Sequence, residues 1–176
     1  MYLDILLKPK SVVIFIAQKN FDEQEFIIAK SYLLKNKFNV FICSDSFSVC
    51  TGDSGMKVKN DILLNNLKSA NFAGLVIIGG KGIVEYFKNN FLISQIKSFY
   101  ENKKIIGAIC AAPVILAKAG ILKNVKSTCN ENYKKDLERE GAVFVPESVV
   151  TEKTIVTAQE PINSIDFITK FIHLLK

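Results

Sequence analysis

The chain has 176 residues, of which 49% are hydrophobic and 23% are charged, with a formal net charge of +6. This length suffices for one well-buried core and is too short for two ordinary domains, so we expect a single domain over residues 1–176. Basic residues are mixed with acidic ones along the chain, as in "KKDLERE", which disfavours nucleic acid as a partner.

The N-terminal segment "MYLDILLKPK" is interrupted by Asp4, Lys8 and Pro9. It therefore offers neither a signal-peptide core nor a membrane span of about 20 apolar residues. We expect a cytoplasmic protein without a membrane partner, in which the four cysteines stay reduced. Those cysteines have no CxxC spacing and no nearby cluster of histidines, so we expect no metal site and no cofactor.

Short β-branched and aromatic runs, typical of strands buried on both faces, recur along the chain. They are residues 11–17, 38–44, 72–80, 104–109, 125–129, 142–145 and 154–158. Segments with helical patterning lie between and after them. They are residues 21–37, 61–70, 83–103, 111–119, 131–141 and 162–176.

The alternation of strands and helices predicts a mostly parallel sheet with helices on both faces. Residues 48–61, with Gly52 and Gly55 between two short alternating runs, predict a small β-hairpin. The fold class is therefore α/β, a flavodoxin-like three-layer α/β/α sandwich. In such folds, functional groups collect at the carboxyl ends of the strands.

Cys110 stands at such a carboxyl end, directly after the predicted strand 104–109. Alanines lie on both sides of it, Pro113 suits the first turn of a helix, and Gly120 suits its end. A sharp strand-to-helix turn that exposes a nucleophile needs such small neighbours. The helix start favours the thiolate, so we expect a reactive cysteine. The competing interpretation is a small buried residue at a strand end.

Two further features accompany the cysteine. Gly79 and Gly80 end the predicted strand 72–80, where their amide groups could approach an oxyanion closely, although an ordinary glycine turn has the same pattern. Glu25 also has two interpretations. With Asp22 it forms a capping-box pattern, or it lies buried near Cys110 with a raised pKa.

The motifs "NFDEQEF", "LVIIGGKG" and "IIGAICAAPVILAKAGIL", in this order, resemble the ThiJ/PfpI superfamily, which includes PfpI-type intracellular peptidases and the parkinsonism-associated deglycases. The likeness extends over nearly the whole chain. It implies that Cys110 is the elbow nucleophile, that Glu25 hydrogen-bonds its sulfur, and that the amides of Gly79, Gly80 and Ala111 form an anion-binding pocket. It also implies a homodimer.

The chain departs from the family at its histidines. Peptidase-like members have a histidine directly after the cysteine, where this chain has Ala111. The deglycase branch usually has one after the elbow helix, where this chain has Asn130 or Cys129 as possible pocket neighbours. The single histidine, His173, lies on the predicted last helix. Chemistry by a Cys-His-acid triad is therefore disfavoured.

Three functions stay open. The first is a cofactor-independent glyoxalase or deglycase, in which Cys110 adds to a small reactive carbonyl and Glu25 moves a proton. The second is a redox sensor whose cysteine is oxidised to sulfinate by a small oxidant. The third is a stress or chaperone protein in which the cysteine has no chemical role.

Overall fold

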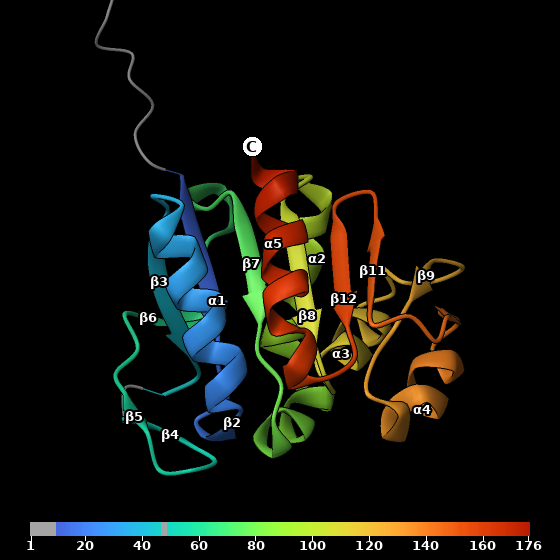
Figure 1. Ribbon diagram of the computed structural model, residues 1–176, viewed down its shortest axis with the longest axis horizontal. Helices are drawn as coiled ribbons and strands as arrows, with labels where there is room; N and C mark the ends of the chain where they lie inside the picture. The colour runs from blue at the N-terminus through green and yellow to red at the C-terminus, as the bar shows by residue number, and fades with distance from the viewer. Residues whose placement is uncertain (1–9, 47–48) are drawn as a thin grey trace, which may run out of the picture.

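The computed structural model describes residues 10–46 and 49–176 and shows a seven-stranded sheet between helices (Figure 1). Neighbouring strands pair in parallel, except that β11 runs antiparallel to β12 at one edge. In spatial order the strands are β11 (Val149–Glu152), β12 (Ile155–Ala158), β8 (Ile105–Ile109), β7 (Gly74–Ile77), β1 (Ser11–Phe15), β3 (Asn39–Ser44) and β6 (Ile62–Leu63).

Helices cover both faces of this sheet, as predicted. Figure 1 shows α1 (Glu23–Lys35) and α5 (Ser164–Leu175) in front of it, and α2 (Asn90–Glu101) and α3 (Pro113–Lys118) behind it. Glycines in the central strands allow α5 to approach closely. A Cβ added to Gly107 of β8 would lie 2.9 Å from Cζ of Phe167.

Two small sheets flank the main one. The predicted hairpin is confirmed in β4 (Cys50–Gly52) and β5 (Lys57–Val58), which pair antiparallel, and β2 (Lys19–Phe21) joins β4. The start of the predicted hairpin segment, Ser48, lies outside the described residues. The second small sheet consists of β9 (Lys126–Ser127) and β10 (Val143–Phe144), close to α4 (Lys134–Arg139).

The prediction of a helix over residues 61–70 is wrong. The Asp61 amide donates to the Ile42 carbonyl, and the Asp61 carboxylate accepts from the Ile42 amide, both at 2.8 Å. These bonds hold the segment along β3, so it forms edge strand β6. Two 3₁₀ turns follow it, η1 (Leu64–Asn66) and η2 (Ser69–Asn71). Strand pairing has overridden the local helical spacing.

The single helix predicted over residues 83–103 is divided in two. A 3₁₀ segment, η3 (Lys81–Lys88), ends at Asn89, whose side chain accepts a hydrogen bond from the Leu92 amide and caps α2. Asparagine competes with the helical backbone in this way and favours helix starts over helix interiors.

The last strands differ from the prediction in two ways. Residues 125–129 and 142–145 do contain strands, but β9 and β10 pair with each other outside the central sheet. The edge strand β11 was not predicted, because "VVTE" is short and half polar. Its turn to β12 contains Lys153 at a φ of 53°.

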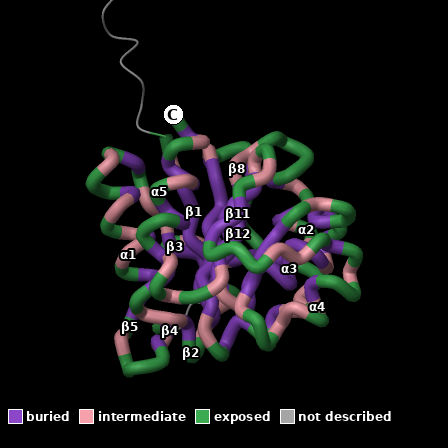
Figure 2. Tube along the Cα trace, turned by 45° about the vertical axis from the view of Figure 1, so that its right-hand side comes forward, coloured by how far each residue is buried: buried purple, intermediate pink, exposed green. Residues whose placement is uncertain are grey.

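The buried core follows the central strands, which are purple in Figure 2, whereas the surrounding turns are mostly exposed. Among the described residues, no helix combines the length and the apolar character needed to cross a membrane.

Candidate active site at the strand-to-helix elbow

Cys110 occupies a sharp turn between β8 and α3, as predicted from its small neighbours and Pro113. Its φ is +62°, a left-handed conformation that costs a non-glycine residue about 1 kcal/mol or more. The backbone is held there from two sides. The Cys110 amide donates to the Ala158 carbonyl at 3.0 Å, and the Cys110 carbonyl accepts from the Asn130 amide at 2.9 Å.

The half-buried thiol of Cys110 has hydrogen bonds from the backbone amides of Gly80 and Ala111. These bonds favour the thiolate, but burial and the negative charge of Glu25 outweigh them and raise the Cys110 pKa to about 11. The expected lowering of this pKa is therefore wrong. The helix start is weak because α3 has only 6 residues, and the sulfur is partly removed from water.

The Glu25 side chain points into the protein, and only 1% of the residue is exposed. Asp22 caps α1 by accepting from the Glu25 amide at 2.9 Å. The reciprocal bond of a capping box is not made, because the Asp22 amide donates instead to the Gly79 carbonyl at 3.1 Å. The Glu25 carboxylate is thus free to contact the elbow region.

Gly79 lies between Glu25 and Cys110. Its amide donates to Oε2 of Glu25 at 2.7 Å. A Cβ added to Gly79 would lie 2.6 Å from Cβ of Cys110 and 3.0 Å from Oε2 of Glu25, so the three residues meet without room for a side chain. Gly79 therefore orients the carboxylate, whereas Gly80 holds the sulfur.

Burial raises the Glu25 pKa well above its usual value, the charge of Asp22 adds to this effect, and the Gly79 amide opposes it. A carboxyl group in this environment keeps its proton into a range where exposed glutamates are ionised. Oε1 of Glu25 is buried and makes no hydrogen bond with any described residue. Glu25 can therefore donate or accept a proton beside the thiol.

A cleft of about 670 Å³ opens at the cysteine. Its lining residues follow the carboxyl ends of β1, β4, β7, β8 and β9 in the chain and are mostly polar. They are Asn20, Asp22, Asp53, Ser54, Gly80, Lys81, Cys110, Asn130, Asn132 and Tyr133.

The two possible pocket neighbours from the sequence have different positions. Asn130 lines the cleft, and its side chain accepts from the Asn132 amide. Cys129 is fully buried, and burial raises its pKa to about 12. Tyr133 and Lys81 were missed from the sequence. Their only signal is that each follows a predicted strand by a few residues, which is common to many surface residues.

The single histidine lies elsewhere. His173 is an exposed residue near the end of α5, where it lines a surface hollow with Tyr32 and Lys35 of α1. It does not line the cleft at Cys110. Within residues 10–46 and 49–176, no three His, Cys, Asp or Glu side chains gather to hold a metal ion.

Comparisons with known proteins match nearly the whole chain. A family model described as "DJ-1/PfpI family" matches residues 10–174. An uncharacterized protein of Methanocaldococcus jannaschii is 32% identical over 158 residues, which cover 88% of this chain and 77% of that protein. Deglycase PH1704 of Pyrococcus horikoshii is 27% identical, with coverage of 93% and 99%.

A glutathione-independent glyoxalase of Caenorhabditis elegans, DJR-1.2, is 24% identical, with coverage of 95% of this chain and 89% of the relative. Among solved structures, a ThiJ/PfpI domain protein of Brachyspira murdochii superimposes with a TM-score of 0.93 at 25% identity, and the match covers 96% of this chain and 98% of that one.

Proposed function

The chain belongs to the DJ-1/PfpI family, and we propose that it is an enzyme of the glyoxalase or deglycase type that acts on small reactive carbonyls. The observation that carries this proposal is the contact of the buried Glu25 carboxyl group with the Cys110 elbow through Gly79. Relatives over most of the chain are named as deglycases and as a glyoxalase, which supports the same chemistry.

With methylglyoxal, the reaction begins when the Cys110 sulfur attacks the aldehyde carbon. A carbon–sulfur bond forms, the carbonyl π bond breaks, and the thiol proton ends on the oxygen to give a hemithioacetal. The ionised form of Glu25 then takes the proton from that carbon and returns a proton to the neighbouring carbon, while the hydroxyl proton passes from the first oxygen to the second. The product is a thioester of a 2-hydroxy acid, which water cleaves to lactate and the free thiol.

The raised pKa values of both groups determine the protonation states from which this reaction starts. At a pKa of about 11 most of the Cys110 thiol is protonated at neutral pH, so the attack draws on the small thiolate fraction, and the proton that the thiol releases ends on the new hydroxyl group. Glu25 is desolvated, and a carboxylate in such a site is a stronger base than one in water. The two amides on the sulfur stabilise negative charge on it as it attacks or leaves.

Peptide hydrolysis is not proposed. Its usual triad needs a histidine beside the cysteine. The residue after Cys110 is Ala111, and the only histidine of the chain is exposed near the end of α5.

The enzyme is proposed to use neither a metal ion nor an organic cofactor, because the steps above need only a thiol and a carboxyl group. We propose further that residues 1–176 form one domain, that the protein acts in the cytoplasm, and that it forms a homodimer, as expected by analogy with its family.

The test is the formation of lactate from methylglyoxal by the purified protein. Cys110→Ala should abolish it, and Glu25→Gln should lower kcat by about 100-fold or more because the proton transfer loses its base. Glu101→Gln, which removes an exposed carboxylate on α2, is the matched control and should be fully active. Lactate formation that is absent in the unmodified protein, or equal in Cys110→Ala, would contradict the proposal.

Redox sensing is a second candidate, favoured by the two amides that already bind the sulfur. Two molecules of hydrogen peroxide would each transfer one oxygen atom to the sulfur and leave as water, so that the thiol becomes a sulfinic acid. Intact-mass measurement after mild peroxide should then show a gain of about 32 Da that is lost in Cys110→Ala. An unchanged mass would rule this candidate out.

A further inference from the structure

The amide groups closest to the elbow are already engaged. Gly79 donates to Glu25, and Gly80 and Ala111 donate to the sulfur of Cys110. A carbonyl compound that adds to this sulfur develops negative charge on its oxygen, and a rapid reaction needs a hydrogen-bond donor aimed at that oxygen. Histidine does not supply it, because His173 does not line the cleft.

Tyr133 is the candidate for this donor. It ends the 3₁₀ turn η4 (Glu131–Tyr133) and lines the same cleft as Cys110. Two backbone bonds connect it to the elbow: the Asn130 amide donates to the Cys110 carbonyl at 2.9 Å, and the Tyr133 amide donates to the Asn130 carbonyl at 2.9 Å. The position of the tyrosine is thus tied to that of the cysteine.

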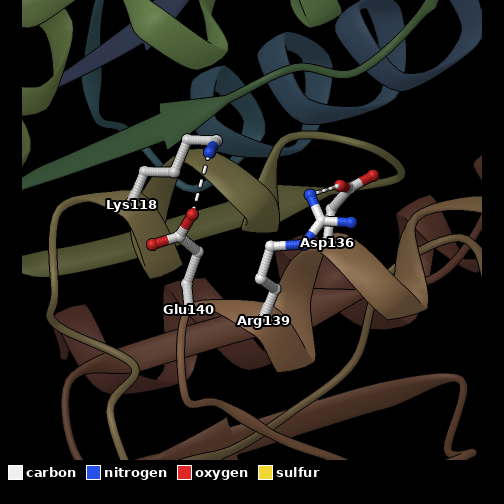
Figure 3. A network of polar contacts seen from close by, with 4 residues as sticks. All are labelled: Lys118, Asp136, Arg139 and Glu140. Carbon is white, nitrogen blue, oxygen red and sulfur yellow. Dashed lines mark hydrogen bonds and ion pairs between the residues drawn. The ribbon is translucent and has the colours of Figure 1, made fainter.

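The ring of Tyr133 also packs against another aromatic ring. It packs edge-to-face against Phe87 of η3, with ring centroids 5.9 Å apart and an interplanar angle of 84°. The helix that follows, α4, is anchored to the elbow helix by an ion pair from Lys118 to Glu140 at 2.9 Å, and Arg139 pairs with Asp136 along α4 (Figure 3). A fixed donor loses less entropy on binding than a mobile one.

The electrostatics agree with this placement. Burial, followed by the charge of the Cys110 thiolate, raises the Tyr133 pKa, so the phenol keeps its proton at neutral pH. The alternative donors in the cleft are weaker candidates. Lys81 and Ser54 are exposed, and the side-chain amide of half-buried Asn130 is much less acidic than a phenol.

We propose that the Tyr133 hydroxyl donates a hydrogen bond to the oxygen of a carbonyl substrate as its carbon bonds to Cys110. The tyrosine keeps its proton throughout, and the thiol proton still ends on the substrate oxygen. This inference rests on the proposed carbonyl chemistry and adds a catalytic residue to it.

The variant Tyr133→Phe tests the proposal, because it keeps the ring contact with Phe87 and removes only the hydroxyl. Tyr100→Phe on α2, which lines a different hollow, is the matched control. Two readouts are needed: kcat for lactate formation from methylglyoxal, and the equilibrium constant for the hemithioacetal between Cys110 and ¹³C-labelled acetaldehyde, measured by NMR. Acetaldehyde forms the adduct but has no second carbonyl to complete the reaction.

We expect Tyr133→Phe to lower kcat by about 100-fold and the adduct constant by about tenfold, with Tyr100→Phe unchanged. Equal values for Tyr133→Phe and the unmodified protein would overturn the role of Tyr133 and leave the proposed function intact. Adduct formation without lactate would instead overturn the proposed function, and the ratio of adduct constants would still decide about Tyr133. A protein that forms no adduct would overturn both.

Discussion

The two ends of the central sheet use the same unusual backbone conformation for different purposes. At the amino ends of β3 and β8, Lys37 and Lys103 have φ values of 64° and 54°. Each directly follows the residue that caps a helix, Asn36 after α1 and Asn102 after α2, so the conformation simply ends a helix. Both lysines are exposed.

At the carboxyl ends, Cys110 has nearly the same φ of 62°, but it follows a strand and precedes a helix. Around it lie a buried carboxyl group with one unpartnered oxygen and two glycines that leave no space for a side chain. Strain that is routine in a helix-ending turn is, at this end, combined with buried ionisable groups. This combination, rather than the positive φ alone, distinguishes the candidate active site.

Gly80→Ala should have the largest effect. Gly80 has a φ of 98°, and an added Cβ would lie 2.5 Å from the Asp22 amide nitrogen, so both conformation and space oppose a side chain. We expect a loss of about 3 kcal/mol in the free energy of unfolding, measured by denaturant titration. Gly55→Ala is the control. Its φ is 101° with no atom nearby, so it should lose only about 1 kcal/mol. Equal losses would show that the elbow is not crowded.

Glu25→Gln should change how stability depends on pH. The folded-state pKa of Glu25 is raised, so the folded protein binds this proton more tightly than the unfolded chain does. Its stabilising contribution is complete below the unfolded pKa of about 4.3 and is lost as pH rises through the folded pKa. Glutamine resembles the protonated acid at every pH. As pH rises from the unfolded pKa of Glu25 through its folded pKa, the free energy of unfolding should therefore fall less in the variant than in the unmodified protein. Parallel curves would mean that Glu25 titrates normally.

Lys37→Gly should raise stability slightly, by about 0.5 to 1 kcal/mol, because glycine adopts the positive φ without strain. Ser31→Gly, at an exposed position inside α1, should instead lower it by about 0.5 kcal/mol. Thermal unfolding of the two variants measures both effects. A destabilised Lys37→Gly protein would show that this turn depends on the lysine side chain.

His173→Ala should have the smallest effect. The residue is exposed near the end of α5, so stability should change by less than about 0.5 kcal/mol and lactate formation should not change. Impaired turnover in this variant would indicate that the opposite end of the sheet takes part in the reaction.

Much of the fold was predictable because buried parallel strands have a strong local signature. The runs around Ile14, Val76 and Ile106 are continuous and apolar, and all three became central strands. The wrong predictions concern strands at the edges of the central sheet. Residues 61–70 have helical spacing, but their backbone pairs with β3 through Asp61, a partner that local patterning does not reveal.

The candidate site was likewise only partly predictable from the sequence. Small residues around Cys110 and a proline three residues after it, in "CAAP", determined that a thiol would stand at a strand-to-helix elbow. Whether Glu25 caps a helix or faces the elbow depended on where Gly79 comes to lie. Whether the Cys110 pKa falls or rises depended on how far the sulfur is buried and on the nearby charge of Glu25. Tyr133 joins the cleft because the loop that contains it is bonded to the Cys110 carbonyl. Local conformation is encoded by neighbouring residues, whereas desolvation and contacts across loops exist only once the chain has packed.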